Sequence, residues 1–291
     1  MKIALHGKLY KDEAQPHIEK LFEILLKHEV EIFLFEPFRI FLEKKGINTS
    51  PYATYNSHGD LVGTDFVFSI GGDGTLLDAV TFVREKEIPI LGINAGRLGF
   101  LATTQPYEIE TALEDFFNKQ YTFDHRSLIH LDADKDLFAG INFGLNEFTI
   151  LKKDTSSMIV VHAYIDGEYL NSYWADGLIV STPTGSTGYS LSCGGPLVMP
   201  SSNNFIIAPI SPHNLNVRPM IVSDSSEVSF KIESRSKNIL VALDSRSKSI
   251  SHTTQLSVRK EKFCAKLVQL KSYNFLETLR SKLNWGLDMR N

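Results

Sequence analysis

Residues 66–80 read FVFSIGGDGTLLDAV, and this stretch decides the fold. Phe66–Ile70 is a continuous apolar run of the kind found in central parallel strands, and the residues from Leu76 onward have the spacing of a helix. Gly71-Gly72-Asp73-Gly74-Thr75 therefore forms a tight turn between a strand and a helix. In an open parallel sheet such a turn lies at the carboxyl end of the strand, where these sheets bind ligands.

Strands and helices alternate on both sides of this turn, through about the first 120 residues. Apolar runs predict the strands, and apolar residues three or four positions apart predict the helices. The predicted strands are Ile3–His6, Ile32–Phe35 and Ile88–Ile93; the predicted helices contain Ile18–Leu25, Phe38–Lys45, Leu76–Lys86 and Ile109–Phe117; and Gly46–Gly63 is rich in turns. The alternation implies right-handed crossovers and a parallel sheet with helices on both faces.

From about Tyr121 the chain changes to strands separated by tight turns. Asp166-Gly167 fits the central positions of a type I′ hairpin, which both need positive φ. The predicted strands are Ser157–Ile165, Glu168–Trp174, Phe205–Ile210, Glu227–Ile232, Ile239–Leu243 and Gln255–Val258, and a closing helix contains Phe275, Leu279 and Leu283. We therefore predict an α/β domain over residues 1–120 and a mainly β domain over residues 121–291, with a C-terminal helix that could pack back on the first domain.

The composition excludes several classes of protein. The 291 residues are 43% hydrophobic, with 30 Lys+Arg against 34 Asp+Glu, so they can fill a core but give no broad basic surface for nucleic acid. The N-terminus lacks the apolar core of a signal peptide, and charges interrupt the most apolar region, Val30–Leu42, so we expect no membrane association. Cys193 and Cys264 form neither a disulfide framework nor a metal-ligand spacing, which predicts a reducing cytoplasm.

Asp73 lies between glycines that let the backbone turn sharply and let a phosphate approach the amide groups. Its carboxylate could take a proton from an attacking hydroxyl or could hold Mg²⁺, and one carboxylate in the turn favours the base. The competing structural interpretation is a turn in which Asp73 or Thr75 only caps the helix. Leu77 occupies the last glycine position of the dinucleotide fingerprint, and no lysine follows as in a Walker loop.

The most informative stretch is residues 176–196, DGLIVSTPTGSTGYSLSCGGP. A strand leads here into a loop in which glycines alternate with hydroxyl groups, which are donors and acceptors for ribose and phosphate oxygens. The hydroxyl residues are Thr184, Ser186, Thr187, Tyr189, Ser190 and Ser192. A plain surface loop rarely needs such a density of both kinds of residue.

These two motifs, in this order and at this separation, resemble the NAD kinase family, and the resemblance covers nearly the whole chain. Agreement continues in Gly92-Ile93-Asn94, Leu98-Gly99-Phe100-Leu101, Asn146-Glu147, Pro212-His213, Arg218-Pro219, Phe275-Leu276, Leu279-Arg280, Lys282-Leu283 and Trp285. Gly-Gly-Asp-Gly alone is shared with diacylglycerol and sphingosine kinases and with phosphofructokinases, whereas the second block is specific. The resemblance implies a Rossmann-like N-terminal domain that binds ATP and a β-rich C-terminal domain that binds NAD.

The resemblance also implies the reaction, which transfers the γ-phosphoryl group of ATP to the 2′-hydroxyl of the adenosine ribose of NAD, with a divalent metal such as Mg²⁺. Asp73 would accept the proton of that hydroxyl. The implied NAD-binding residues are Asp73, Gly74, Asn146, Glu147, Asp176, Thr187, Gly188, Tyr189, Ser190, Leu191 and Ser192, with Thr184, Phe100 and Arg246 as further candidates. No residue is predicted as a metal ligand. Family members usually assemble as dimers or tetramers, so we expect a homodimer or homotetramer.

Two positions depart from the family pattern. Gly188 replaces the usual alanine before the tyrosine, and Asp244-Ser245-Arg246 stands where many members have Asp-Gly-Gln. Outside the family context, Asn146-Glu147 is a turn pair at the end of a strand, Cys193 is a packing residue and His213 is a turn residue. Two other functions stay open on the residues alone: a lipid or sugar kinase that shares only the first motif, and a nucleotide-binding regulator without catalysis. The sequence also leaves open whether polyphosphate can replace ATP.

Overall fold

The computed structural model describes residues 1–96, 99–153, 158–271 and 273–286. The chain divides into two compact units: unit 1 comprises residues 1–125 and 265–291, and unit 2 comprises residues 126–264. Leu98 and Ser157, which belong to predicted motifs and strands, lie outside the described residues.

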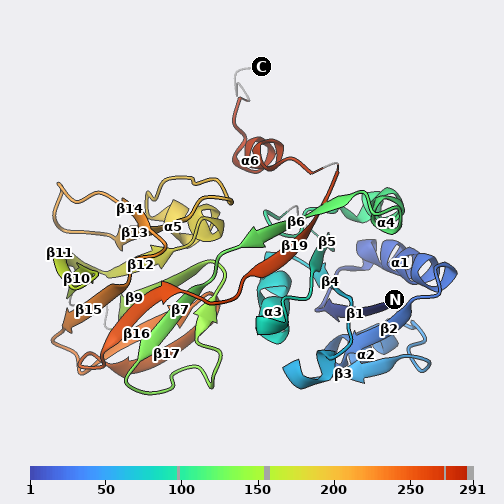
Figure 1. Cartoon of the computed structure of the whole chain (residues 1–291), viewed down its shortest axis with the longest axis horizontal. Helices are drawn as coiled ribbons and strands as arrows, with labels where there is room; N and C mark the ends of the chain where they lie inside the picture. Colours follow the sequence, from blue (N-terminus) through green and yellow to red (C-terminus); the bar gives the residue numbers. More distant parts are fainter. Residues whose placement is uncertain (97–98, 154–157, 272, 287–291) are drawn as a thin grey trace. The chain divides into compact units, whose positions relative to one another are not determined.

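Unit 1 is built on a seven-stranded sheet (Figure 1). Its strands are, in spatial order, β3 (Ala53–Tyr55), β2 (Glu31–Phe35), β1 (Lys2–Gly7), β4 (Phe66–Gly71), β5 (Ile90–Asn94), β19 (Ala265–Leu270) and β6 (Tyr121–Arg126). Strands β1 to β5 pair in parallel, and β19 joins β5 in parallel. Because parallel strands point the same way, the carboxyl ends of β1, β4 and β5 meet at one edge of the sheet.

Unit 1 also contains helices and 3₁₀ turns. They are α1 (Gln15–Lys27), α2 (Glu36–Lys44), α3 (Asp73–Val83), α4 (Ile109–Phe117) and α6 (Phe275–Leu283), with 3₁₀ turns η1 (Asp12–Ala14), η2 (His58–Leu61), η3 (Arg84–Lys86) and η4 (Pro106–Glu108). Ile18, Leu21, Phe22 and Leu25 of α1 are all buried, as their spacing predicts. Helix α1 packs against α4, and α3 packs against β4 and β5.

The predicted strands and helices of unit 1 are confirmed, with small shifts of their ends. The turn-rich stretch Gly46–Gly63 differs from the prediction, because it contains β3 and η2. β3 is an edge strand of three residues, of which only Tyr55 is buried. A strand this short and this exposed has no apolar pattern to reveal it.

Unit 2 consists mainly of two six-stranded antiparallel sheets. One has the order β11 (Glu168–Ala175), β10 (Ile159–Ile165), β15 (Val228–Glu233), β18 (Leu256–Lys260), β7 (Ile129–Ala133) and β8 (Phe143–Gly144). The other has the order β14 (Met220–Ser223), β13 (Asn204–Ile210), β12 (Gly177–Ser181), β9 (Glu147–Lys152), β16 (Asn238–Leu243) and β17 (Arg246–Ser251). One core joins side chains of both sheets, including Val161 of β10 and Val180 of β12, so the unit is a β-sandwich.

Two tight hairpins in unit 2 place an aspartate in the left-handed conformation. Asp166 and Gly167 join β10 to β11 with φ of 50° and 86°, which confirms the predicted turn. Asp244 and Ser245 join β16 to β17, and Asp244 has φ of 51°. Aspartate tolerates positive φ better than most residues.

The last part of the chain returns to unit 1. The boundary after residue 120 and the second domain 121–291 differ from the observed division, because β19 and α6 group with residues 1–125. β19 pairs in parallel with β5, at Leu267 and Ile90, inside the seven-stranded sheet. Unit 2 is thus a contiguous segment inserted between two parts of unit 1.

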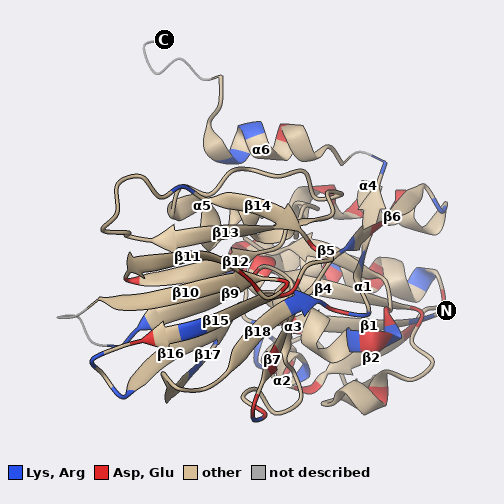
Figure 2. Ribbon diagram, turned by 60° about the vertical axis from the view of Figure 1, so that its left-hand side comes forward, with Lys and Arg blue, Asp and Glu red and all other residues tan. Residues whose placement is uncertain are grey.

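Along the ribbon of Figure 2, the positions of Lys and Arg are interspersed with those of Asp and Glu. This agrees with the formal net charge of −4. In the described part of the chain, every helix is too short or too polar to cross a bilayer.

Candidate functional site

The turn of the first motif begins α3. Asp73 is the first residue of the helix, and Gly72 is its N-cap, which makes no side-chain capping hydrogen bond. The interpretation that Asp73 or Thr75 only caps the helix is therefore wrong. A Cβ at Gly71 would lie 2.2 Å from Thr75 Oγ1, so the turn requires glycine at this position.

The Asp73 carboxylate is half-buried and accepts hydrogen bonds from three successive backbone N–H groups. Oδ2 accepts from Phe100 at 2.8 Å, and Oδ1 accepts from Leu101 and Ala102, both at 3.0 Å. A Cβ at Gly99 would lie 2.0 Å from Asp73 Oδ1, so the family motif around Phe100 can approach the carboxylate only because Gly99 has no side chain. These contacts fix the carboxylate in one orientation.

A cavity of about 880 Å³ lies at the carboxyl edge of the unit 1 sheet. Gly71 at the end of β4, Gly72 after it and Asn94 at the end of β5 line the cavity, together with residues of the connection from β1 to α1 and of η4. A Cβ at Gly72 or Gly74 would meet no atom within 4 Å, so the chain leaves room for a phosphate group at both glycines. Pockets for small ligands are about 300–1,000 Å³, so the cavity can hold a nucleotide.

In unit 2, the second motif is held against Asn146. The carbonyl oxygen of Asn146 accepts hydrogen bonds from Thr182 N at 2.8 Å and from Ser181 Oγ at 3.2 Å. A Cβ at Gly185 would lie 2.2 Å from the same oxygen. The chain then forms the 3₁₀ turn η5 (Thr184–Thr187) and the short helix α5 (Tyr189–Ser192).

Glu147 is the first residue of β9, so the prediction that Asn146-Glu147 ends a strand is wrong. Its side chain is buried, and its Oε2 has no hydrogen-bond partner within the described part of the chain. Burial first, and the negative charge of Asp244 second, raise the pKa of the Glu147 carboxyl to about 8. A Cβ at Gly188 would lie 3.3 Å from Glu147 Oε2, so this acid lies beside the glycine-rich loop.

The hydroxyl groups of the second motif are not equivalent. Ser186 Oγ is buried and exchanges hydrogen bonds with the backbone of Val198, so this hydroxyl is committed to the fold. Thr184 Oγ1 accepts from Arg126 Nη1 at 3.1 Å. Ser190 Oγ is buried and, among the described residues, has no hydrogen-bond partner, whereas Tyr189 is exposed.

Three further predicted residues have protein partners. Asp176 forms an ion pair with Lys152 at 2.6 Å and contributes to raising the pKa of Tyr189, after burial and Cys193. Arg246 donates hydrogen bonds to the carbonyl oxygens of Ile141 and Phe143. The Nζ of Lys282 lies 5.6 Å from the centre of the Phe100 ring in unit 1.

The structure therefore gathers two sets of predicted residues. Asp73, Gly74 and Phe100 belong to unit 1, and Asn146, Glu147, Asp176 and the loop Thr184–Ser192 belong to unit 2. The sequence interpretation missed the contacts of Gly99 and Asp244. In the sequence, these contacts are indicated only by a glycine directly before Phe100 and by an aspartate in a two-residue turn.

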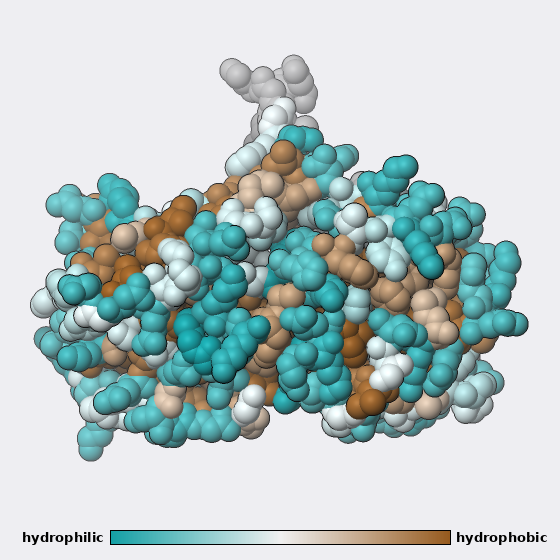
Figure 3. Space-filling view, viewed as in Figure 1, coloured by the Kyte–Doolittle hydropathy of each residue, from teal (hydrophilic) through white to brown (hydrophobic). Residues whose placement is uncertain are grey.

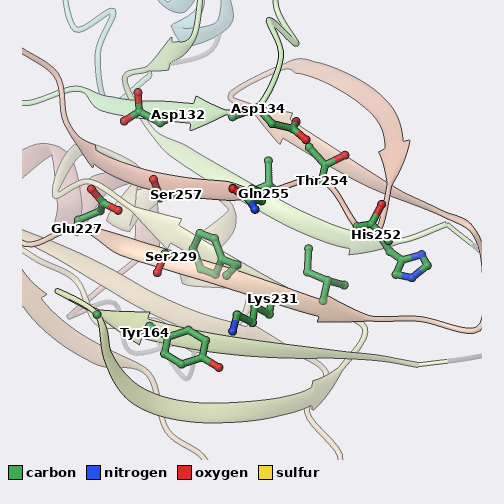
Figure 4. A pocket seen from close by; sticks show the side chains of 16 residues that line it. Asp132, Asp134, Tyr164, Glu227, Ser229, Lys231, His252, Thr254, Gln255 and Ser257 are labelled. Carbon is green, nitrogen blue, oxygen red and sulfur yellow. The ribbon is translucent and has the colours of Figure 1, made fainter.

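Another hollow, of about 840 Å³, lies on the sheet that contains β10, β15, β18 and β7 (Figure 4). Tyr164, Lys231 and Gln255 are among its side chains, and the Nζ of Lys231 lies 5.5 Å from the centre of the Tyr164 ring. None of the predicted site residues lines this hollow. It therefore plays no part in the candidate site.

Known protein families match both parts of the chain. Residues 3–121 match the ATP-NAD kinase N-terminal domain, and residues 145–270 match the ATP-NAD kinase C-terminal domain. The chain is 54% identical to an NAD kinase of Cytophaga hutchinsonii and 43% identical to one of Bacteroides fragilis, in each case over 100% of both chains.

Solved structures agree with these matches. A yeast NADH kinase complexed with NADH shares the fold, with a TM-score of 0.87 and 22% identity, over 100% of this chain and 89% of that one. An NAD kinase from Archaeoglobus fulgidus in complex with ATP has a TM-score of 0.77 and 28% identity, over 98% of this chain and 99% of that one. The Rossmann-like and β-rich parts expected from the motifs are thereby confirmed, and the chain belongs to the NAD kinase family.

Proposed function

We propose that this chain is an NAD kinase that phosphorylates the 2′-hydroxyl of the adenosine ribose of NAD with ATP. The hydroxyl oxygen forms a bond to the γ-phosphorus of ATP, the bond from that phosphorus to the β-phosphate oxygen breaks, and ADP and NADP result. The observation that carries the proposal is full-length identity of 40–54% to several relatives named NAD kinase.

The acceptor NAD is proposed to bind in unit 2. The supporting feature is Glu147, a buried acid beside a loop of glycines and hydroxyl groups, whose Oε2 accepts no hydrogen bond from any residue that the structure describes. A protonated carboxyl donates one hydrogen bond and accepts others, so it suits a ribose or an adenine. The residues proposed to contact NAD are Asn146, Glu147, Asp176, Thr187, Gly188, Tyr189, Ser190, Leu191 and Ser192, with Gly74 of unit 1.

The donor ATP is proposed to bind in the cavity of unit 1. This cavity lies where open parallel sheets bind nucleotides, and Gly71 and Gly72 of the first motif line it. The Archaeoglobus fulgidus relative was solved in complex with ATP. The amide groups at the start of α3 favour an anion there without any net positive charge.

Asp73 is proposed to accept the proton of the ribose hydroxyl. A carboxylate offers about four acceptor positions, and the backbone N–H groups described above occupy three of them. Among the described residues Oδ1 accepts two hydrogen bonds and Oδ2 accepts one, so the remaining position lies on Oδ2. The N–H groups of Phe100, Leu101 and Ala102 also hold the carboxylate still, so it needs no rearrangement during the transfer.

A divalent cation such as Mg²⁺ is proposed to accompany ATP and to neutralise charge on its phosphates. Within the described residues, no group of three or more His, Cys, Asp and Glu side chains could hold a metal ion. Mg²⁺ in kinases is commonly held by substrate phosphates, waters and one or two carboxylates. This donor set fits a metal that arrives bound to ATP.

We further propose a homodimer or homotetramer formed through unit 2. Trp174 on the edge strand β11 is 55% exposed, and Met220 and Ile221 on the edge strand β14 are 41% and 49% exposed. Figure 3 shows apolar surface at the upper left, where Figure 1 places β13 and β14. Exposed apolar patches commonly mark interfaces between proteins. Light scattering would give the mass of the assembly in solution. Cys193 and Cys264, the two cysteines of the chain, are not joined in a disulfide, which supports a cytoplasmic location.

The proposed function is tested by NADP formation from ATP, Mg²⁺ and NAD, followed by the same assay with polyphosphate. Asp73→Asn should lower kcat by about 10²–10⁴-fold, the usual contribution of a general base. Asp60→Asn is the matched control, since Asp60 Oδ2 also accepts backbone N–H groups, from Asn56 and Ser57. Near-normal turnover of a folded Asp73→Asn variant would show that another group takes the proton. Phosphorylation of a lipid or a sugar without NADP, or NAD binding without ATP consumption, would overturn the function itself.

A further inference from the structure

Asp244 is tied to the backbone of the proposed acceptor site by four hydrogen bonds. Its Oδ2 accepts from Leu145 N at 2.8 Å, and its Oδ1 accepts from Asn146 N at 2.8 Å and Glu147 N at 3.1 Å. Its own N–H donates to Glu147 O at 3.0 Å. One turn residue thus binds the N–H groups of three successive residues and one of their carbonyl groups.

The conformation of Asp244 and its neighbours Gly144 and Arg246 make these hydrogen bonds possible. The positive φ of Asp244 is what a two-residue hairpin of this kind requires. A Cβ at Gly144 would lie 2.9 Å from Asp244 Oδ1, so the segment approaches closely because Gly144 has no side chain. Arg246, two residues further on, holds Ile141 O at 2.6 Å and also Phe143 O. The hairpin therefore fixes the chain from Ile141 to Glu147.

This arrangement matches the one around Asp73. In both places a carboxylate accepts hydrogen bonds from three successive backbone N–H groups, and a glycine leaves room for it. A turn that served only the fold would gain little from a carboxylate beside Glu147, because its negative charge opposes ionisation of Glu147. What the carboxylate does provide is a fixed backbone under Asn146 and Glu147.

We propose that Asp244 is a positioning residue of the kinase reaction, which holds the backbone of residues 145–147 so that the Asn146 and Glu147 side chains are presented to NAD. The proposal rests on the proposed function of unit 2. It assigns no contact between Asp244 and either substrate. Its effect should therefore appear in the binding of NAD and not in the binding of ATP.

Asp244→Asn and Asp244→Ala test this positioning role. Asparagine keeps an oxygen for the N–H groups of Asn146 and Glu147 but turns its amide group toward Leu145 N–H. We expect its KM for NAD to rise about tenfold, the effect of one lost hydrogen bond to a charged acceptor. Alanine should raise this KM further, and both variants should keep the KM for ATP within about twofold.

Asp166→Asn is the matched control. Asp166 is likewise the first residue of a two-residue hairpin turn in unit 2 and has positive φ. Its N–H donates to Glu227 O at 2.9 Å, and its Oδ1 accepts from Glu227 N at 2.9 Å. This variant should leave both KM values unchanged. If Asp166→Asn loses as much thermal stability as the Asp244 variants but keeps its KM for NAD, a loss of stability alone does not explain the raised KM of the Asp244 variants.

Gly144→Ala gives an independent test if the Asp244 variants do not fold. The added Cβ presses on the Asp244 carboxylate without removing it. It should also raise the KM for NAD alone. Unchanged KM for NAD in folded Asp244→Ala or Gly144→Ala, or an equal rise of both KM values, would overturn the proposal. Absence of NADP formation by the wild-type protein would instead refute the proposed function.

Discussion

Glu147→Gln is expected to stabilise unit 2 at neutral pH, although it removes a residue proposed to bind NAD. In the native protein the residue is 8% exposed, and burial, followed by the charge of Asp244, raises the pKa of its carboxyl from 4.5 to about 8. The unfolded chain releases this proton near pH 4.5, whereas the native protein retains it. A rise in pH above 4.5 therefore favours unfolding, until the native carboxyl also ionises near pH 8.

The expected size follows from the two pKa values. Each pH unit between them lowers the free energy of unfolding by about 1.4 kcal/mol. Since pH 7 lies about 2.5 units above 4.5, the loss at pH 7 is about 3 kcal/mol. Glutamine has nearly the same shape and does not titrate, so Glu147→Gln should recover most of this loss. Below pH 4.5 the wild-type protein and the variant should have nearly equal stability.

Urea unfolding of both proteins between pH 5 and pH 8 measures this difference. Trp174 lies in unit 2 and Trp285 in unit 1, so a Trp285→Phe background restricts the fluorescence signal to unit 2. The difference in free energy of unfolding should grow with pH. The same variant should have a higher KM for NAD, which would show that the buried acid serves binding at the expense of stability.

Glu261→Gln is a control of opposite sign. Burial, the largest single effect, opposes ionisation of the Glu261 carboxyl. The hydrogen bonds from His130 and the Lys262 backbone, together with the charges of His130 and Arg259, outweigh it, and the pKa is lowered from 4.5. The ionised form therefore stabilises the native protein above pH 4.5, and this contribution is lost as the pH falls through the lower native pKa. Glu261→Gln should thus be destabilising at pH 7.

Two results would refute the reasoning about Glu147. One is a Glu147→Gln variant that is less stable than wild type at pH 7. The other is a difference in free energy of unfolding between variant and wild type that is constant from pH 5 to pH 8.

Gly185→Ala should lower the free energy of unfolding by about 1–3 kcal/mol and weaken NAD binding, because the added Cβ would lie 2.2 Å from Asn146 O. Gly59→Ala, whose Cβ would meet only Ser57 Oγ at 3.6 Å, is the control in urea unfolding. Equal stability of the two variants would show that the chain tolerates a side chain at Gly185. Asn274→Ala should destabilise α6 by about 1 kcal/mol, because Asn274 Oδ1 accepts the N–H groups of Leu276 and Glu277. Hydrogen exchange of α6 measures this loss, and unchanged protection would exclude a capping role.

The elements that bury a periodic apolar face were predictable from the sequence. Phe66–Ile70 and the α1 residues Ile18–Leu25 are examples, because burial itself imposes the spacing that the sequence displays. β19 was missed as a strand of the first sheet. Its sequence AKLVQL mixes apolar and polar residues, and no local pattern states which strand it will join.

The candidate site was predictable where it forms contiguous motifs. The turn around Asp73 and the loop Thr184–Ser192 stand out through glycine and hydroxyl content. The contacts of Asp244 were not predictable, because Leu145 lies 99 residues away along the chain. Asn146-Glu147 was assigned to the wrong end of a strand, since the short strand β8 precedes it and β9 begins at Glu147.

The insertion of unit 2 between the two parts of unit 1 has a consequence for biosynthesis. Unit 2 can complete its fold as soon as residue 264 has left the ribosome, because all of its strands are contiguous in the chain. The seven-stranded sheet must wait for Leu267, which pairs with Ile90 after 177 intervening peptide bonds. Until then the edge of β5 is open at Ile90. A ribosome stalled near residue 264 would therefore carry a nascent chain with a finished unit 2 and an unfinished sheet of unit 1 that is prone to aggregate.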